Sequence, residues 1–212
     1  MKIAVFSDVH DNLVRWREAA EIIKREKIKI GFCCGDIGDL QTVEEVANSF
    51  ETLYLALGNL DFKLKNGLDS RLRSSSLSDE AQASESNDGN DKESGDDRNG
   101  QNDEQRSKNT TGLFPENVVF TQDYGEVELE NRKIAFVHSN RLAKELAEAQ
   151  GYDIVFYGHT HTPWEEKVSP STPLRTGSTL LLNPGEVAGQ FGRASFAIYD
   201  LAKMTAELKM LK

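Results

Sequence analysis

The first sixty residues alternate short apolar runs with amphipathic segments, and this order constrains the fold more than any other feature. Apolar runs typical of buried strands occur at residues 2–7, 28–34 and 52–57. The intervening segments predict helices over 13–26 and over 42–49, the second opened by a capping box at Thr42. Consecutive strands joined by helices run parallel in one sheet. The sequence therefore predicts an α/β fold that begins with a βαβαβ unit.

The pattern changes after residue 117, where short strands follow one another with turns between them. We expect strands over 118–121, 124–129, 133–138, 154–157, 164–168, 180–183, 195–200 and 205–210, a hairpin turn at Glu130-Asn131 and one helix over 141–149. A largely parallel first half and an antiparallel second half predict two packed sheets with helices outside.

A polar segment from residue 74 to residue 112 separates the two halves. It holds ten acidic and four basic residues, a net charge of −6 out of −10 for the chain, and its only apolar residues are Leu77, Ala81 and Ala83. Such a segment cannot bury enough apolar surface to offset its ordering entropy. We therefore expect a single domain over 1–212 that carries a disordered acidic insertion, for which a tolerated surface loop is favoured over a lid or docking arm.

Composition and cysteine usage exclude several classes of protein. The longest apolar runs are far shorter than the roughly 20 residues that cross a bilayer, and the first residues do not form a secretion signal. The only cysteines, Cys33 and Cys34, are adjacent, so strand geometry points them to opposite faces and favours a reducing, cytoplasmic setting. The short apolar runs predict no membrane partner, and the lack of a basic stripe argues against an extended nucleic-acid groove as partner.

Polar residues that can bind metals follow five of the predicted strands. They include all four histidines of the chain, and the set is Asp8, His10, Asp36, Asn59, His138, His159 and His161. Ligands of α/β sheets gather beyond the carboxyl ends of the strands, so we expect these side chains to converge at one edge. Taken singly, each histidine is more often a surface or hydrogen-bonded core residue than a ligand, and Asp36 could cap a turn. Together they are too many for one tetrahedral zinc site and suit two metals bridged by a carboxylate.

The order of these motifs resembles the calcineurin-like metallophosphoesterase superfamily. The matching elements are Asp8-x-His10, Gly35-Asp36, Gly58-Asn59, a lone His138 and Gly158-His-Thr-His161. Ser7-Asp8-Val-His10-x-Asn12 and Leu182-Asn183-Pro184-Gly185 further resemble its small prokaryotic phosphodiesterases. The resemblance implies a four-layer α/β/β/α sandwich of two mixed sheets. It also implies that Asp8, His10 and His161 hold one metal, that Asn59, His138 and His159 hold a second, and that Asp36 bridges them.

The donor types agree with that chemistry. Imidazole, carboxylate and amide ligands without thiolate suit Mn²⁺, Fe²⁺, Co²⁺, Ni²⁺ or Zn²⁺, and the resemblance favours manganese. Two such ions lower the pKa of a bridging water, giving a hydroxide for in-line attack on phosphorus while both ions neutralise the phosphoryl oxygens. Asp36, Asn59 and His138 would act by positioning metal and phosphate. We expect hydrolysis of a small phosphoester, most simply a phosphodiester.

Several positions depart from the pattern of the superfamily. Leu60 stands where many members have a histidine that assists the leaving group, which puts esters with poor leaving groups in doubt. Asp61 could orient a ligand or cap a turn. Ser139 and Glu186 replace a common Gly and a common Ser at positions that are not metal ligands. Asn12 and Arg141 could contact the substrate phosphate, although a solvated surface role is favoured for each.

A binding module on the same fold is the alternative function. The retromer subunit that resembles these phosphoesterases acts as a scaffold with a decayed metal site, whereas the ligand set is complete here. A purely structural metal site is a weaker alternative, because such sites are usually closed and hold one ion. The sequence leaves the physiological substrate, the native metal and the oligomeric state open.

Overall fold

The first of two sheets is built mainly by the N-terminal half of the chain. The computed structural model describes residues 1–68, 112–149, 151–169 and 177–212, so the predicted insertion lies outside the described residues except for Gly112. The strands of this sheet are β1 (Lys2–Phe6), β2 (Ile30–Cys33), β3 (Thr52–Ala56), β4 (Val118–Thr121), β10 (Ser195–Asp200) and β11 (Thr205–Met210). Their order is β11-β10-β1-β2-β3-β4. Strands β1 to β3 are parallel as predicted, whereas β4, which was expected in the antiparallel second half, pairs parallel with β3.

The second sheet differs from the prediction of an antiparallel second half. Its strands are β5 (Tyr124–Leu129), β6 (Arg132–Val137), β7 (Ile154–Tyr157), β8 (Trp164–Val168) and β9 (Thr179–Asn183), in the order β5-β6-β7-β9-β8. The three central strands are parallel, and only the two edge strands pair antiparallel with their neighbours. β6 and β7 are joined through a helix, which permits the parallel pairing. Both sheets are therefore mixed.

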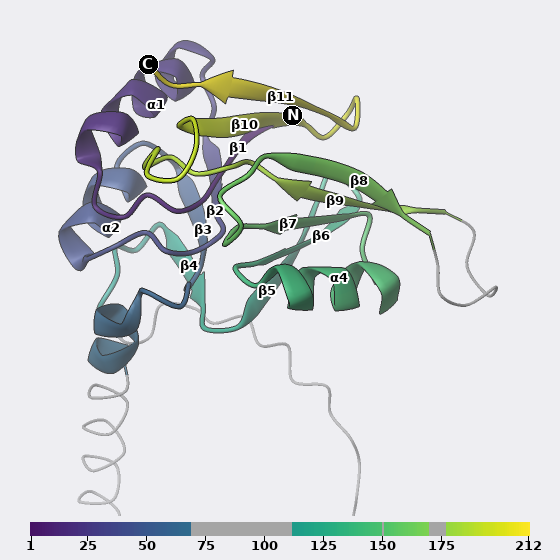
Figure 1. Ribbon diagram of the computed structural model, residues 1–212, viewed down its shortest axis with the longest axis horizontal. Coiled ribbons are helices and arrows are strands. Elements are labelled where there is room, and N and C mark those ends of the chain that lie inside the picture. Colours follow the sequence, from purple (N-terminus) through teal and green to yellow (C-terminus); the bar gives the residue numbers. More distant parts are fainter. Residues whose placement is uncertain (69–111, 150, 170–176) are drawn as a thin grey trace, which may run out of the picture.

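The helices lie on the outer faces of the two sheets (Figure 1). They are α1 (Leu13–Arg25), α2 (Leu40–Ala47) and α4 (Asn140–Ala149), and residues 62–68 are also helical. Apolar residues of α1 and α2 share one core cluster with the first sheet, whereas α4 packs Ala143 and Ala147 onto β6 and β7. The arrangement is the expected four-layer α/β/β/α sandwich.

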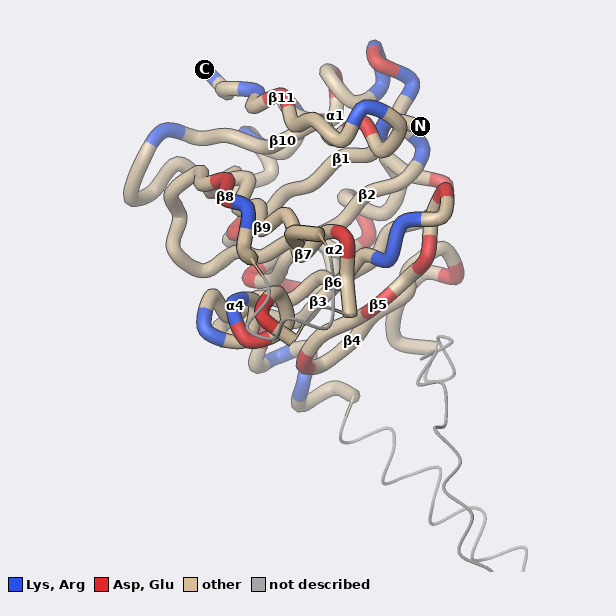
Figure 2. The backbone as a smooth tube through the Cα atoms, turned by 90° about the vertical axis from the view of Figure 1, so that its right-hand side faces the viewer, with Lys and Arg blue, Asp and Glu red and all other residues tan. Residues whose placement is uncertain are grey.

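Aromatic side chains fill the core between the two sheets. Phe32 of the first sheet contacts Phe136 and Phe156 of the second, each with ring centroids 5.4 Å apart in an edge-on arrangement. Charged residues are placed away from this core, on α4 and β5 for example, whereas β7 and β9 carry none (Figure 2). The central strands β7 and β9 are buried along their whole length, as parallel strands usually are.

Two local predictions have different outcomes. Glu130 and Asn131 form the hairpin turn between β5 and β6, with φ values of 48° and 61° typical of a two-residue hairpin. The capping box at Thr42 is wrong, because α2 begins two residues earlier with Asp39 as its N-cap. The Asp39 side chain accepts a hydrogen bond from the Thr42 backbone N–H at 3.0 Å.

The two cysteines point to opposite faces of the first sheet. Cys33 belongs to the core beneath α1 and α2, and Cys34 belongs to the core between the sheets. Burial raises the pKa of both thiols. We expect no reaction with an aromatic disulfide reagent in the native state and two reactive thiols per chain in denaturant, measured by absorbance. Rapid reaction of the folded protein would contradict this packing.

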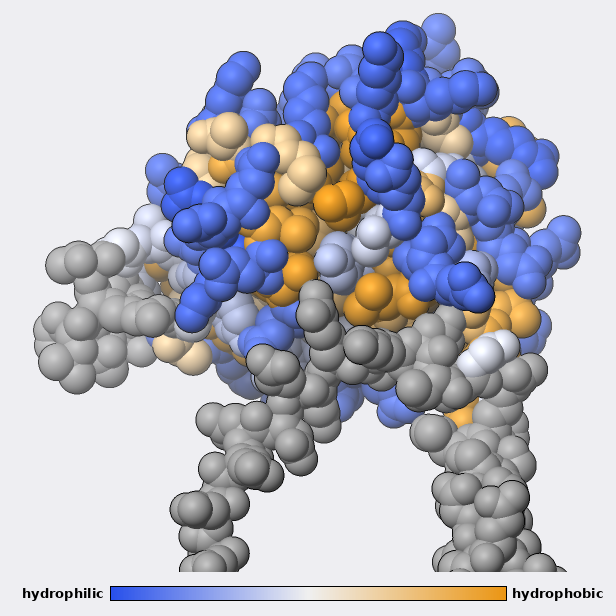
Figure 3. All heavy atoms as spheres, turned by 180° about the vertical axis from the view of Figure 1, so that it is seen from behind, coloured by the Kyte–Doolittle hydropathy of each residue, from blue (hydrophilic) through white to orange (hydrophobic). Residues whose placement is uncertain are grey.

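The surface is mostly polar. From the side opposite to Figure 1, hydrophilic side chains surround smaller areas of hydrophobic ones (Figure 3). Large apolar side chains that remain exposed include Leu60, Phe62, Trp164 and Phe191. Among the described helices, none is long and apolar enough to cross a membrane.

Candidate metal centre

The loops that follow β1 and β2 are joined through their backbones. The Asp8 N–H donates to the Gly35 carbonyl at 2.9 Å, and the His10 N–H donates to the Asp36 carbonyl at 3.1 Å. Left-handed φ values occur at five of the seven predicted ligands, namely Asp8, His10, Asp36, His159 and His161. Such backbone strain is uncommon outside glycine and concentrates at functional sites.

Asp8, His10 and His161 form one group of potential metal ligands. Asp8 Oδ1 lies 3.7 Å from His10 Nε2 and 3.4 Å from His161 Nε2. Asp8 Oδ1 and His10 Nε2 are buried without a hydrogen-bond partner among the described residues. A buried polar atom without a partner is costly, and a divalent cation between these three atoms would satisfy them. The donors therefore fit a metal ion.

Asp36, Asn59, His138 and His159 form the neighbouring group. His138 Nε2 lies 2.9 Å from Asn59 Oδ1, 3.3 Å from Asp36 Oδ2 and 3.2 Å from His159 Nδ1. His159 Nδ1 is also 3.1 Å from Asn59 Oδ1. The structure thus brings together all four predicted ligands of this group, which come from the ends of β2, β3, β6 and β7.

The second ring nitrogen of His138 determines its tautomer. Nδ1 lies 2.8 Å from the Cys34 carbonyl oxygen, which can only accept, so Nδ1 carries the proton. In neutral His138 the lone pair of Nε2 then faces the Asn59 and Asp36 oxygens, which are also electron-rich. A cation among these atoms removes the repulsion. The arrangement is that of a histidine oriented for metal binding by its outer hydrogen bond.

The pKa shifts of Asp36 and His138 show that each side chain favours the charged form of the other. Burial alone raises the pKa of the Asp36 carboxyl, but hydrogen bonding and charge from His138 outweigh burial, so the net shift is downward. For His138, burial lowers the pKa, but interactions with Asp36, together with Asp8 and the Cys34 carbonyl, outweigh burial, so the net shift is upward. The pKa of Asp8 is raised because its carboxyl is buried. Asp8 also lies near the second group, because its ligand oxygen is within 4.8 Å of the ligand atoms of Asp36 and His138.

Asp61 joins two of the site loops. Its buried carboxylate accepts the Gly38 N–H at 3.0 Å and the Gly58 N–H at 2.8 Å, which ties the loop after β2 to the loop after β3. Its side chain therefore positions the backbone two residues after Asp36 and directly before Asn59. Leu60 donates its N–H to Asp36 Oδ1 at 2.8 Å, while its side chain is 54% exposed.

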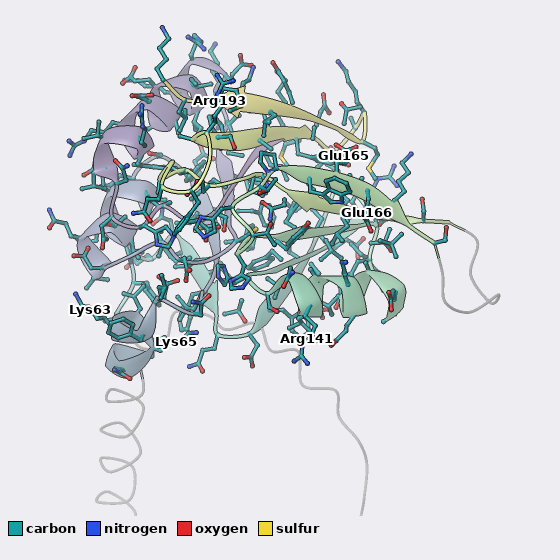
Figure 4. All side chains as sticks on the ribbon, in the orientation of Figure 1. Lys63, Lys65, Arg141, Glu165, Glu166 and Arg193 are labelled. Atoms are coloured by element: carbon teal, nitrogen blue, oxygen red, sulfur yellow. The ribbon has the colours of Figure 1, made fainter. Side chains whose placement is uncertain are left out.

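Asn12 and Arg141, the two candidate phosphate contacts, have different surroundings in the structure. Asn12 caps α1 by accepting the Arg15 N–H, and its amide donates to the Ala188 carbonyl at 3.0 Å. Arg141 extends from the start of α4 with its side chain 87% exposed (Figure 4). In the described part of the chain, Arg141 pairs with Glu145 at 3.8 Å and with none of the metal-ligating residues.

Two positioning residues were not recognised from the sequence. Asn183 donates to the Gly158 carbonyl and to Thr160 Oγ1, which holds the loop that carries His159 and His161. The Glu186 carboxylate is fully buried and lies 2.9 Å from His161 Nδ1. The Asn183-Pro184-Gly185 motif indicated that this region matters, but no local pattern indicated which histidine Asn183 and Glu186 position.

The sequence profile of the calcineurin-like phosphoesterase superfamily domain matches residues 1–204. The chain belongs to this superfamily. The converging carboxylates, imidazoles and amide described above are thus candidate metal ligands in a family of metal-dependent phosphoesterases.

Individual members of the superfamily are similar over nearly the whole chain. A phosphodiesterase, MJ0936 of Methanocaldococcus jannaschii, is 27% identical over 209 residues, which cover 96% of this chain and 95% of that protein. A solved archaeal phosphodiesterase has a TM-score of 0.66 at 24% identity, with full coverage of both chains. Vps29 of Chaetomium thermophilum shares the fold with a TM-score of 0.57 at 12% identity, covering 99% of this chain and 94% of that one.

Proposed function

We propose that the protein is a phosphodiesterase that binds two divalent metal ions. One would be held by Asp8, His10 and His161 and the other by Asn59, His138 and His159, with Asp36 between them. The observation that carries the proposal is the convergence of electron-rich atoms, two of them buried without partners. The similarity to phosphodiesterase MJ0936 supports a diester as the substrate class.

The ligands favour ions of hard to borderline character, and we propose Mn²⁺. Two bound cations would lower the pKa of a water shared between them and neutralise charge on the phosphoryl oxygens. Residues of the chain supply the framework for this. Asp61 fixes the two loops that carry Asp36 and Asn59, and the Cys34 carbonyl holds His138 in the tautomer whose Nε2 faces the site.

The residue after Asn59 bears on substrate choice. The exposed Leu60 side chain cannot donate a proton to a departing alkoxide. Diesters with good leaving groups, such as aryl esters, are therefore expected to react faster than alkyl esters. Asn12 and Arg141 remain candidates for phosphate contact. The net charge of −10 on the chain favours a small phosphoester over a nucleic-acid duplex as the substrate.

A scaffold function is the second candidate, because Vps29 shares the fold. Metal binding alone does not separate the two functions, since a shared fold does not imply a shared activity. Hydrolysis is the property that distinguishes them.

We expect manganese-loaded protein to contain about two ions per chain and to hydrolyse bis(4-nitrophenyl) phosphate faster than 4-nitrophenyl phosphate. Elemental analysis and steady-state kinetics measure the two properties. Chelator-treated protein is the control, and activity should return when Mn²⁺ is added. Two bound ions without hydrolysis of either ester would favour the scaffold, and one ion or fewer would contradict the two-metal site.

A further inference from the structure

Glu186 is a buried carboxylate in the segment between β9 and β10. Its side chain is 0% exposed, and its backbone carbonyl accepts the Ser195 N–H at 2.8 Å. A charged group that is buried so completely is expensive unless it is paired and hydrogen-bonded. Its contacts therefore indicate what it does.

Both carboxylate oxygens of Glu186 are occupied. Oε2 lies 2.9 Å from His161 Nδ1 and 3.0 Å from the Gln190 N–H. Oε1 accepts the Phe191 N–H at 2.7 Å and the Gly192 N–H. Three consecutive backbone donors and one imidazole thus surround the carboxylate. Backbone N–H groups can only donate, so these three hydrogen bonds stabilise the carboxylate as an anion.

The contact with Glu186 decides the tautomer of His161. A carboxylate can only accept, so His161 Nδ1 carries the proton and Nε2 presents its lone pair. That lone pair faces Asp8 Oδ1 at 3.4 Å. At His138 the same task is done by a neutral backbone carbonyl. Glu186 differs because its full negative charge also makes the imidazole a stronger donor to a cation.

The same carboxylate also holds the loop that carries Phe191, whose ring contacts His161. By holding the N–H groups of residues 190–192, Glu186 shapes the loop that carries Phe191. The Phe191 ring packs edge-on against His161, with centroids 4.7 Å apart, although the Phe191 side chain is 79% exposed. His161 therefore contacts Glu186 through its Nδ1 atom and Phe191 through its ring.

We propose that Glu186 is the positioning residue of His161, which fixes its tautomer and ring orientation and thereby strengthens metal binding at the Asp8, His10 and His161 group. This inference rests on the metal site of the proposed function, but not on hydrolysis. It assigns a role to a residue that the sequence motifs leave without one.

The first test uses the unaltered, metal-free protein. Two-bond ¹⁵N–¹H correlation spectra above pH 8 should show His161 as the Nδ1–H tautomer. The chain has only four histidines, so a His161→Asn spectrum assigns the signal by its disappearance. A His161 ring protonated at Nε2 would overturn the proposal without any substitution at Glu186.

The second test is Glu186→Gln, which keeps the shape and removes the charge. We expect calorimetric titration with Mn²⁺ to show one of the binding events weakened by about 10- to 100-fold, and His161 to populate both tautomers. Glu165→Gln is the matched control, since Glu165 is an exposed residue of β8 (Figure 4). The Glu165→Gln protein should bind Mn²⁺ with the same affinity as the unaltered protein.

The outcomes separate this inference from the proposed function. A folded Glu186→Gln protein with unchanged Mn²⁺ affinity would overturn the positioning role even if diesters are hydrolysed. Weakened Mn²⁺ binding would support the role even if the unaltered protein hydrolyses no diester. If the variant does not fold, the tautomer of His161 in the unaltered protein still decides the question.

Discussion

Replacing Asp36 with asparagine is expected to lower kcat/KM for an aryl phosphodiester by more than about 100-fold, and Asp61→Asn by about 10- to 100-fold. Asp36 Oδ2 faces His138 and would be lost as an anionic ligand between the two metals. The described hydrogen bonds of the Asp61 side chain go only to the loop backbone at Gly38 and Gly58. Steady-state kinetics at saturating Mn²⁺ compares the two variants.

Metal content adds a second measure to this comparison. Asp36→Asn should retain fewer Mn²⁺ ions per chain than Asp61→Asn. Asp61→Asn should instead lower the free energy of unfolding by about 1 to 3 kcal/mol, because the new amide group faces a backbone donor. Equal losses of activity would show that Asp36 does not bridge. Since Asp8 lies close to Asp36 and His138 as well as to His10 and His161, a larger metal loss in Asp8→Asn would move the bridge to Asp8.

Gly58→Ala is expected to destabilise the protein and weaken the metal site together. An alanine Cβ would overlap the side chain and the backbone nitrogen of Asp36. The backbone cannot retreat freely, because the Gly58 N–H is held by Asp61 at 2.8 Å. Overpacking of this kind costs about 1 to 3 kcal/mol. Thermal unfolding of metal-free protein and titration with Mn²⁺ measure the two effects.

Gly151→Ala is the matched control for this substitution. An added Cβ at Gly151 meets no atom of the described residues within 4 Å, so the free energy of unfolding of the Gly151→Ala protein should change by less than about 0.5 kcal/mol. If Gly58→Ala were as stable as Gly151→Ala and bound Mn²⁺ unchanged, the close approach of Gly58 to Asp36 would have no role in forming the site.

The elements of the fold were predictable because their signals are local. Apolar runs located the strands, helical spacing located α1, and the adjacent cysteines face two different cores as strand alternation requires. The pairing of the second half was not predictable in the same way. Strands β10 and β11 join the first sheet, and β6, β7 and β9 are parallel, because pairing depends on which apolar faces can be buried together.

The sequence by itself determined the succession of strands and helices in the first sixty residues and the residues that meet at the carboxyl edge of these strands. Parallel strands end on the same side, so Asp8, Asp36 and Asn59 had to converge. Only the tertiary structure decided how these residues are held. Glu186 meets His161 and the Cys34 carbonyl meets His138 across 25 and 104 residues of chain. Such contacts depend on how two separate sheets and their loops pack, and no periodicity within one segment carries that information.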